Sequence, residues 1–367
     1  MKKMLLIVPA LHQGGFEKVC VATARLLQPY FQIQIVIFDS REIAYDIRGL
    51  EVIDLHLPSR PGKLVKLWNV VKRGYKLHQI KKKEGIDIAY SFGPTANIAN
   101  IVSGAEAAKW LGIRSYMDMN NPKQIEWFCK SADKVLCCSE RIRGEIEKDY
   151  GCQKAVTLHN PFDLKEIELL AEKEEASLPW EEGRILVSMG REDTVKGFWH
   201  LIKSFSLVHE ALPDTKLMII GQGEYAQYKE LAAGLGIEEA VCFTGLQKNP
   251  YPYLKRSSLY VLTSYNEGFP NALVEAMALG VPAVATDCLT GPDEILEDRY
   301  GILVPNMSPE ADFSPRNITE EERELADRII ALLEDEGQME HYREMAKKRA
   351  GDYTAERYIA GIRAMAQ

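Results

Sequence analysis

The sequence of 367 residues lacks any long uninterrupted apolar segment. No window of eighteen apolar residues occurs, so no membrane-spanning helix is predicted. The run Met4 to Leu11 follows two lysines, as in a signal peptide, but Pro9 and the polar residues 12–15 interrupt the pattern and no cleavage site of small residues follows. We therefore interpret this run as a first buried strand and expect a cytoplasmic protein.

The sequence lacks cysteine pairs of the kind that bind metals, and it lacks a complete dinucleotide-binding motif. The seven cysteines form no Cys-x-x-Cys pair and no spacing to histidine typical of a metal site, so we expect free thiols in a reducing compartment. The segment Gly221-Gln222-Gly223-Glu224 lacks the third glycine and the later acid of the dinucleotide fingerprint. A dehydrogenase is therefore a weak option.

The length of the chain fits two domains rather than one core. Apolar runs alternate with helical patterns in both halves, which predicts two doubly wound, mainly parallel α/β sheets followed by C-terminal helices. The predicted strands are 4–11, 31–38, 86–90, 113–117, 134–138 and 155–158, then 184–189, 216–220, 241–244, 259–263, 282–285 and 302–304. We predict domains over residues 1–165 and 166–350, with a helix in 351–367 that packs back on the first domain.

The net charge of −8 is unevenly distributed. Residues 1–165 carry 25 Lys and Arg against 17 Asp and Glu, whereas the remainder carries 20 against 36. We therefore expect the first half to meet an anionic surface or substrate, and we expect no nucleic acid as a partner.

A basic stretch from Arg60 to Lys83 holds nine Lys or Arg and no acid. Five apolar residues recur in it at helical spacing: Leu64, Leu67, Trp68, Val71 and Tyr75. Such a helix packs on its domain through the apolar face or lies on an anionic bilayer. We expect both: apolar face packed, some basic surface left for a membrane.

The segment Ser264 to Gly280 predicts a strand end, a loop and a helix that Pro270 opens. Glu267 lies in the loop, and Glu275 lies about one turn inside the helix. The start of a helix has unpaired backbone N–H groups and attracts anions. Carboxylates beside such a start suit a ligand that carries both phosphate and hydroxyl groups. The plainer interpretation is an ordinary strand-loop-helix unit in which Glu267 favours the helix dipole.

Two cations are expected at the end of another strand. Gly190 and Arg191 follow the run 184–189, and Lys196 and Gly197 open the next helix. The carboxyl edge of a parallel sheet is where doubly wound folds bind ligands. Two positive charges there suit a diphosphate, although either residue alone would be read as a surface cation.

These segments together resemble the retaining glycosyltransferases of family four, which have the GT-B fold of two Rossmann-like domains facing across a cleft. The motifs that carry the resemblance are Gly190-Arg191, Lys196-Gly197, Glu267-Gly268-Phe269-Pro270 with Glu275, Gly14-Gly15-Phe16-Glu17 and Gly291-Pro292-Asp293-Glu294. The run from Glu267 to Leu296 is similar to bacterial members that build capsule, exopolysaccharide or lipid-linked oligosaccharide chains.

The resemblance implies a role for each matching residue. Arg191 and Lys196, beside Gly190, match the pair that holds the donor diphosphate, and Glu275 matches the glutamate that binds the ribose hydroxyls. Glu267 matches the glutamate that reaches the donor sugar. The remaining donor contacts are implied for Gly14, Gly15, Leu246, Gly268, Phe269, Asn271, Ala272 and Leu273.

One departure from the family pattern concerns the first domain. Many members have a histidine at the end of the strand that is here followed by residues 116–121, and this segment has none. Asp118, Asn120 or Asn121 would then supply the bond to the donor sugar. Asn120-Asn121-Pro122 fits a simple helix cap equally well.

The resemblance implies a metal-independent hexosyltransferase in which Glu267, Arg191, Lys196 and Asp118 are the candidate catalytic residues. It would move a hexose or N-acetylhexosamine from a nucleotide sugar, with UDP as the favoured carrier, to a glycan or lipid-linked acceptor. No aspartate pair flanks a single residue at a strand end, so no metal and no cofactor are expected. A nucleotide-sugar epimerase and a non-catalytic nucleotide-sugar-binding regulator remain alternatives.

Overall fold

The computed structural model describes residues 1–59, 61–104 and 106–367. The chain forms two compact units, residues 1–161 with 355–367 and residues 162–354. These bounds differ by a few residues from the predicted division. None of the described helices combines the length and the apolar composition that crossing a membrane requires.

Unit 1 is built on a parallel sheet that has seven strands among the described residues, in the order β3-β2-β1-β4-β5-β6-β7. Neighbouring strands pair in parallel register, for example Leu5 with Gln34 and with Ala89. The strands are β1 (Lys3–Val8), β2 (Gln32–Ile37), β3 (Val52–Asp54), β4 (Ile88–Phe92), β5 (Ala108–Ile113), β6 (Lys134–Cys137) and β7 (Ala155–Thr157). The helices are α1 (Gly15–Leu27), α2 (Lys63–Glu84), α3 (Pro94–Val102), η1 (Tyr116–Asn120), α4 (Pro122–Ser131), α5 (Glu140–Tyr150) and α14 (Ala355–Met365).

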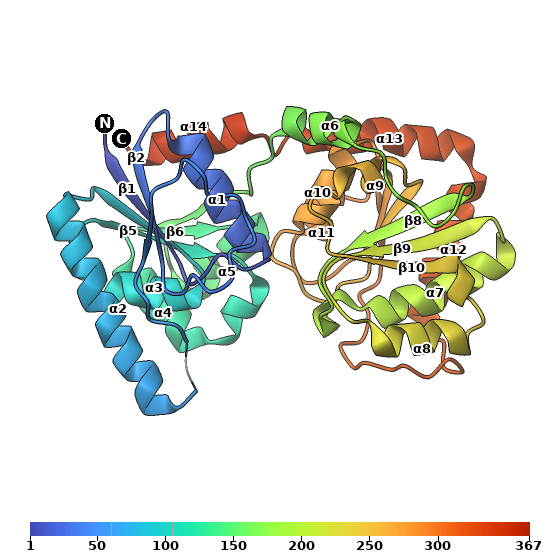
Figure 1. Ribbon diagram of the computed structural model, residues 1–367, viewed down its shortest axis with the longest axis horizontal. Helices are drawn as coiled ribbons and strands as arrows, with labels where there is room; N and C mark the ends of the chain where they lie inside the picture. The colour runs from blue at the N-terminus through green and yellow to red at the C-terminus, as the bar shows by residue number, and fades with distance from the viewer. Residues whose placement is uncertain (60, 105) are drawn as a thin grey trace. The chain divides into compact units, whose positions relative to one another are not determined.

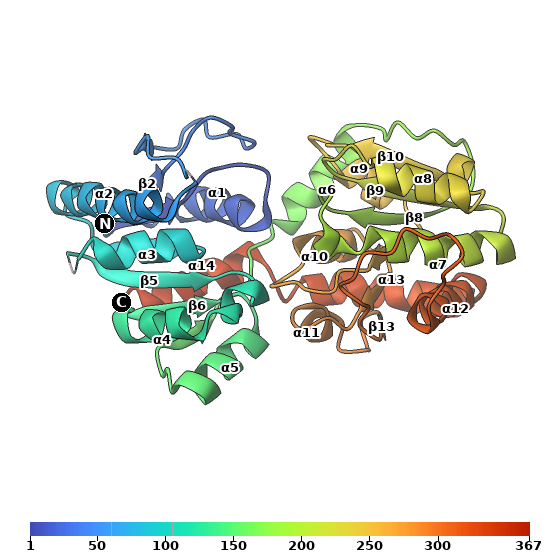
Figure 2. The same ribbon diagram turned by 90° about the horizontal axis from the view of Figure 1, so that it is seen from below.

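Alternation along β1 builds the two cores of unit 1. Met4, Leu6 and Val8 belong to one buried cluster with α1 and α14, while Leu5 and Ile7 belong to another with α2 and α3. Side chains of a strand point alternately to opposite faces, so a continuous apolar run needs helices on both sides of the sheet. The helices lie on both faces in this unit (Figure 1, Figure 2).

Unit 2 repeats the plan with a parallel sheet that has six strands in the described chain, ordered β10-β9-β8-β11-β12-β13. The strands are β8 (Arg184–Met189), β9 (Thr215–Ile220), β10 (Val241–Gly245), β11 (Leu259–Leu262), β12 (Ala283–Thr286) and β13 (Ile302–Val304). The helices are α6 (Leu164–Lys173), η2 (Thr194–Lys196), α7 (Phe198–Ala211), α8 (Ala226–Gly234), η3 (Glu238–Ala240), α9 (Tyr251–Lys255), α10 (Asn271–Ala278), α11 (Pro292–Leu296), α12 (Glu320–Glu334) and α13 (Glu336–Ala350). Two parallel sheets of this kind confirm the predicted α/β class.

Most predicted strands are present, but three predictions of local structure are wrong. The strand expected at 113–117 ends at Ile113, because a capping box begins a 3₁₀ helix at Tyr116. The short strand β3 was not expected, since three residues give no clear alternation. Pro270 lies one position before α10 instead of opening it.

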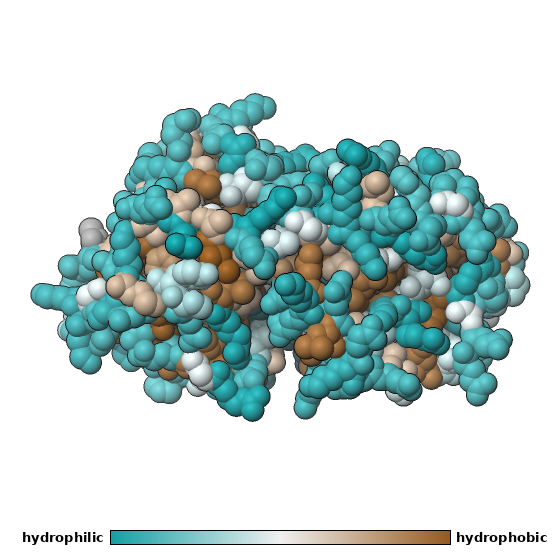
Figure 3. Space-filling model, turned by 90° about the horizontal axis from the view of Figure 1, so that it is seen from above, coloured by the Kyte–Doolittle hydropathy of each residue, from teal (hydrophilic) through white to brown (hydrophobic). Residues whose placement is uncertain are grey.

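Polar residues cover most of the face drawn in Figure 3, and hydrophobic residues form small separate groups on it. All seven cysteines are free, and Cys242 alone among them is not buried. The prediction of free thiols is therefore confirmed.

Candidate functional site

The switch point of the second sheet lies between β8 and β11. The chain runs from β8 to β9 and β10 on one side and then crosses to β11 on the other side of β8. Ligands of doubly wound folds bind at the carboxyl ends of the two strands where the order reverses. Gly190 follows β8 and residues 263–270 follow β11, so the topology brings together the two segments that the sequence singled out.

An ion pair joins these two segments. The Nζ of Lys196 lies 2.7 Å from Oε1 of Glu267, and their side chains are 24% and 11% exposed. The two residues are 71 positions apart in sequence. The backbone holds them in register, because Tyr265 N–H donates to the carbonyl of Val195 and the Thr263 hydroxyl donates to the carbonyl of Lys196.

Three glycines allow this close approach of loops. A Cβ on Gly190 would lie 3.1 to 3.2 Å from the Lys196 side chain, which runs across it. Gly197 has a left-handed backbone with φ of 59°, and a Cβ there would lie 2.3 Å from the carbonyl oxygen of Thr263. A Cβ on Gly221 would overlap the carbonyl oxygen of Gly190 at 1.8 Å. Larger residues at these positions would push the loops apart.

Arg191 is the more exposed of the two predicted cations. Its side chain is 60% exposed, and Nη2 donates to Oδ2 of Asp193 at 3.0 Å. Asp193 in turn caps η2 by accepting the N–H of Val195. The guanidinium therefore stands at the mouth of the site, whereas Lys196 lies deeper.

The loop that carries Glu267 is braced from β12 and the segment after it. The Thr290 hydroxyl donates to the carbonyl of Glu267, and the Thr286 hydroxyl donates to the carbonyl of Ser264, both at 2.5 Å. Gly291, with φ of 96°, packs so closely that a Cβ would lie 2.6 Å from Pro270. The sequence identified Gly291 by its motif, but it did not identify the two threonines.

Helix α10 places Glu275 in the interior, with 2% of the residue exposed. Burial raises the pKa of the Tyr260 hydroxyl, and the negative charges of Glu267 and Glu275 raise it further. Both glutamates therefore lie near the same buried side chain of β11, although Glu267 belongs to the loop and Glu275 to α10.

The other predicted donor contacts fall into two groups. Gly268, Phe269 and Leu273 are buried, and the ring of Phe269 packs 5.0 Å from that of Tyr353. Asn271 and Ala272 are half-buried at the start of α10. Leu246 follows β10 and is exposed.

One residue at this edge was missed by sequence reasoning. The carboxylate of Glu192 accepts the N–H groups of Glu224 and Tyr225 at 2.8 and 3.0 Å and so ties the loop after β9 to the loop after β8. Gly223 leaves room for it, because a Cβ there would lie 2.5 Å from Cβ of Glu192. The paired glycines 221 and 223 were the available signal.

In unit 1 the predicted glycine turn follows β1. The Tyr45 hydroxyl accepts the N–H of Gly14 at 2.9 Å and donates to its carbonyl at 2.6 Å. Gly15 is the first residue of α1, and a Cβ on Gly14 would collide with the carboxylate of Glu17. The turn is therefore closely packed and held by a tyrosine 31 residues away.

Asp118 and Asn121, two of the three candidates for the place of the family histidine, make local hydrogen bonds after β5. Oδ2 of Asp118 accepts the N–H groups of Arg114 and Ser115 at 3.0 and 3.3 Å. Asn121 caps α4 by accepting the N–H of Gln124. Asn120 is exposed. A sugar contact by Asp118 stays a prediction, and the capping alternative holds for Asn121.

Asp118 should make the stability of unit 1 depend on pH. Burial raises the pKa of its carboxyl to about 6, against the opposing effect of the backbone N–H of Arg114. A raised folded-state pKa gives stability that is complete below the unfolded value of about 4 and is lost as the pH rises through about 6. In the wild type, the free energy of unfolding of unit 1 should fall by about 2 to 3 kcal/mol across this window, and in Asp118→Asn this fall should be absent. Hydrogen exchange in unit 1 measures it.

The matched control is Asp87→Asn. Asp87 also accepts a backbone N–H, that of Lys3 at 2.7 Å, but it is exposed. This variant should keep the pH profile of the wild type. An unchanged profile in Asp118→Asn would contradict the assignment.

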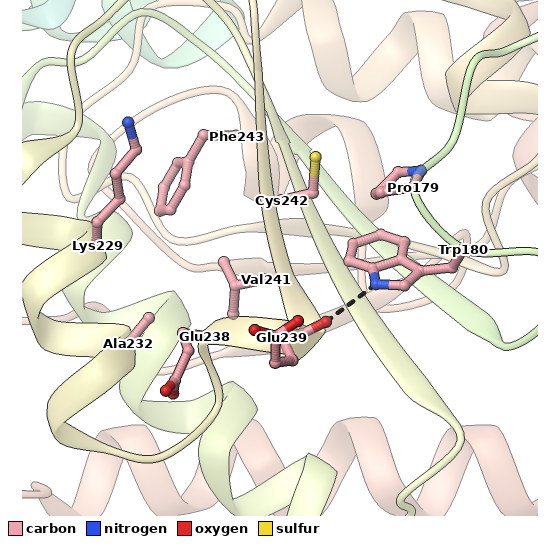
Figure 4. A pocket seen from close by; sticks show the side chains of 9 residues that line it. All are labelled: Pro179, Trp180, Lys229, Ala232, Glu238, Glu239, Val241, Cys242 and Phe243. Atoms are coloured by element: carbon pink, nitrogen blue, oxygen red, sulfur yellow. Dashed lines mark hydrogen bonds between the residues drawn. The ribbon is translucent and has the colours of Figure 1, made fainter.

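A separate cavity of about 450 Å³ lies at the edge of the second sheet. Figure 4 shows Phe243, Val241 and Trp180 around it, with the indole of Trp180 donating to the carbonyl of Glu239 at 3.0 Å. Its lining includes neither member of the ion pair. Its place at β10 instead of the switch point makes it a weaker candidate for the reaction site.

No group of three or more His, Cys, Asp or Glu side chains in the described ranges is arranged to hold a metal ion. The cations that the candidate site offers are those of Lys196 and Arg191. Metal-independence stays a prediction.

Comparison with known proteins gives three findings. The family model described as glycosyl transferases group 1 matches residues 171–349. An uncharacterised glycosyltransferase of Methanocaldococcus jannaschii is 30% identical over 337 residues, covering 80% of this chain and 82% of that protein. The N-acetylgalactosamine-N,N'-diacetylbacillosaminyl-diphospho-undecaprenol 4-alpha-N-acetylgalactosaminyltransferase of Campylobacter jejuni is 24% identical over 369 residues, covering 95% of each chain.

The fold likeness covers both units. The crystal structure of HepE of Anabaena in complex with UDP superposes with a TM-score of 0.78 at 19% identity, covering 99% of each chain. A second crystal structure, sucrose-phosphate synthase from Thermosynechococcus elongatus, gives a TM-score of 0.78 at 15% identity over 99% of this chain and 98% of that chain.

Proposed function

Because this chain belongs to the glycosyltransferases of group 1, we propose that it moves a hexose or N-acetylhexosamine from a nucleotide sugar to a glycan or lipid-linked glycan. Its fold is that of the GT-B glycosyltransferases, with two Rossmann-like domains, so the resemblance and the fold class predicted from sequence are confirmed. Retention at the anomeric carbon, the hexose and the acceptor belong to the proposal.

The Lys196–Glu267 ion pair at the switch point carries this proposal. A nucleotide sugar offers a diphosphate that needs positive charge and a sugar whose hydroxyls need an acceptor. The pair presents one group for each at 2.7 Å separation. Without a donor, the salt bridge holds both side chains in position. When a donor enters between them, each side chain exchanges its partner for a contact with the ligand.

Leaving-group chemistry assigns the cations their role. When the bond between the sugar carbon and the phosphate oxygen breaks, negative charge develops on the nucleoside diphosphate. Lys196, with Arg191 at the mouth and the amino end of α10 nearby in the loop, supplies positive potential for that charge. A bond then forms between the sugar carbon and an acceptor oxygen, and the acceptor proton passes to the departing phosphate.

The two glutamates serve different parts of the donor in this proposal. Glu267, in the loop and partnered by Lys196, contacts the sugar near the reacting carbon. Glu275, buried on α10, accepts hydrogen bonds from the ribose hydroxyls. UDP is favoured as the carrier because HepE binds UDP, and a lipid-linked acceptor is supported by the C. jejuni relative, whose name specifies a diphospho-undecaprenol substrate.

A turnover assay tests the proposal. The protein is incubated with UDP-glucose, UDP-galactose and their N-acetylated forms, with and without glycan acceptors, and released UDP is measured. We expect UDP release that an acceptor accelerates, and a product whose anomeric configuration matches the donor by NMR. Interconversion of the sugars without UDP release would indicate an epimerase, and binding without either product would indicate a regulator.

Glu275→Gln should weaken UDP binding by removing a charged acceptor for the ribose. A hydrogen bond to a charged group contributes about 1.5 to 3 kcal/mol, so the Kd should rise by roughly 10- to 100-fold. Calorimetry with UDP and 2'-deoxy-UDP makes the test specific. The wild type should prefer UDP, and the variant should bind both equally.

The comparison variant is Glu267→Gln. It should retain the preference for UDP over the deoxy form and lose mainly turnover, because its partner is the sugar. If Glu275→Gln keeps full discrimination at the 2'-hydroxyl, the ribose assignment is wrong.

A further inference from the structure

Helix α2 turns its apolar side to solvent. The side chains that recur at helical spacing are largely exposed: Leu64 83%, Leu67 64%, Trp68 60%, Val71 48% and Tyr75 63%. We call these five residues the outward stripe. The expectation that α2 packs on its domain through this stripe is wrong.

The buried side of α2 combines Leu77, which lies in the apolar core, with polar side chains whose polar groups have partners. The guanidinium of Arg73 donates to the carbonyl of Leu57 and lies 4.4 Å from the ring centroid of Phe38. The Nζ of Lys81 donates to Oδ1 of Asn100 at 2.7 Å. These contacts fix which way the helix faces, so the outward stripe is a consequence of how α2 is anchored.

Gly74 brings α2 against α3. A Cβ on Gly74 would lie 2.7 Å from Cγ1 of Val102, so no larger residue fits there without a shift. The contact is tight on the inner side, whereas the outer side has large apolar residues. Exposed side chains of this size in a continuous row mark an interaction surface.

Lysines border the outward stripe. The exposed ones are Lys66, Lys72, Lys76, Lys82 and Lys83, of which Lys76 donates through Nζ to the carbonyl of Leu55 at 2.8 Å. The sequence has no carboxylate between residues 61 and 83. Nζ of Lys72 lies 5.3 Å from the ring centroid of Trp68. Arg60, at the beginning of the predicted basic stretch, lies outside the described residues. Long lysine side chains can reach up to a polar layer while the stripe lies in an apolar one.

We propose that α2 docks the protein on an anionic phospholipid bilayer by inserting the outward stripe below the headgroups while its lysines bind lipid phosphates. Apolar and aromatic residues on one face with lysines beside them are the features of helices that lie in a membrane interface. The proposal goes beyond sugar transfer and does not depend on it.

Charge distinguishes a bilayer from a second copy of the chain as the occupant. Two copies joined through this stripe would bring their lysines together, and α2 offers no acid before Glu84 to compensate. An anionic lipid surface contributes attraction of about 1 kcal/mol for each lysine near it. On an anionic bilayer, burial of the outward stripe and attraction between the lysines and lipid phosphates therefore both favour binding.

The position of α2 in unit 1 adds a geometric argument. Helix α2 follows β3, so its amino end lies toward the carboxyl edge of the sheet, the edge that also carries Gly14 and Asp118. In Figure 1 the first turns of α2 extend past the rest of this unit. A bilayer that holds these turns lies close to the functional edge of unit 1.

Flotation with vesicles tests the proposal. The full-length protein is mixed with vesicles of phosphatidylcholine and phosphatidylglycerol, or of phosphatidylcholine alone, without donor or acceptor. We expect binding to the anionic vesicles that high salt weakens. Lys66→Gln, Lys72→Gln and Lys82→Gln together should lower the partition coefficient by on the order of a hundredfold, and Lys76 is kept because its Nζ donates to the carbonyl of Leu55. Leu67→Ser with Trp68→Ser should lower it by at least about tenfold.

A second readout detects insertion directly. Brominated acyl chains should quench part of the tryptophan fluorescence of the wild type, and Trp68→Phe should abolish that quenching while vesicle binding persists. Binding without quenching of Trp68 would overturn insertion. Lys81 is left unchanged in every variant, because it is buried and bonded to Asn100.

The matched control is Leu169→Ser. Leu169 is 69% exposed on α6 of unit 2, among acidic neighbours such as Glu168 and Glu172, so its loss should leave vesicle binding unchanged. If it reduces binding as much as the changes in the stripe do, the effect is non-specific and the proposal fails. A dimer that the Leu67→Ser, Trp68→Ser variant dissociates, with no binding of the wild type to vesicles, would assign the stripe to a second copy instead.

Discussion

Lys196→Ala is expected to lower kcat/KM by about 100- to 1,000-fold, the loss seen when one preorganised group that stabilises developing charge is removed. Lys196 lies deep at the switch point and pairs with Glu267, so it can place a fixed positive charge against the leaving diphosphate. The loss should appear mainly in kcat, because the charge on the leaving group is larger in the transition state than in the bound donor. Steady-state release of UDP measures both constants.

Arg191→Ala is the companion variant, and its effect should be smaller, about tenfold. Its side chain is 60% exposed and shares its charge with Asp193, so solvent already screens it. A double-mutant cycle of Lys196→Ala and Glu267→Gln should show strong non-additivity, since the two side chains contact each other. Equal effects of the Lys196 and Arg191 variants, or a change in kcat/KM below twofold for Lys196→Ala, would contradict the role assigned to the ion pair.

The strands of the two sheets could be predicted because their signal is local. The run 184–189 coincides with β8 and the run 302–304 with β13. The misplaced strand at 113–117 shows the limit: Ile113 ends β5, and two capping hydrogen bonds from Asp118 and Ser115 turn the chain where apolar residues alone suggested continuation. Side-chain capping competes with extended structure and is not visible in hydrophobic periodicity.

The candidate site was predictable in its members but not in all of its contacts. Glu267 and Lys196 each lie in a motif that carries the family resemblance, and the order of strands explains why they meet. The carboxylate of Glu192 and the hydroxyl of Thr290 act through backbone groups far away in sequence. For α2, periodicity located the apolar stripe correctly. It could not say which side faces the domain, because the anchors of Arg73 and Lys81 are carbonyl oxygens of distant residues.

Glu322→Ala is expected to destabilise unit 2 by about 3 to 5 kcal/mol, the cost of removing one partner of a buried charge cluster. Glu322 is fully buried at the start of α12, and Oε1 lies 2.7 Å from Nδ1 of His200 and 4.0 Å from Nζ of Lys203. His200 and Lys203 are themselves buried in α7. Without the carboxylate, Lys203 loses a nearby counter-charge and His200 loses the hydrogen-bond partner of Nδ1, and the buried position keeps solvent from replacing either.

The second oxygen of Glu322 makes a different contact, so its contribution to stability can be measured separately. Oε2 accepts the N–H of Thr319 at 2.8 Å in a capping box, worth about 1 kcal/mol. Glu322→Gln keeps an acceptor for the cap and removes the charge, so it should retain the capping contribution and still lose most of the rest. Hydrogen exchange in α7 and α12 measures the change locally without assuming that both units unfold together.

The control for this cluster is Glu320→Ala, two positions away and exposed on the same helix, which should change stability by less than about 0.5 kcal/mol. Lys203 retains Asp312 at 3.0 Å in every variant, so the loss measured in Glu322→Gln reports chiefly on His200 and on the shared field of the cluster. If Glu322→Ala changes protection no more than Glu320→Ala does, other groups compensate the loss of the carboxylate and α7 and α12 are joined by apolar packing alone. A large loss of protection confined to these two helices would instead show that the charge cluster joins α12 to α7. Because α7 begins two residues after Lys196, the cluster would then help to hold Lys196 in the candidate site.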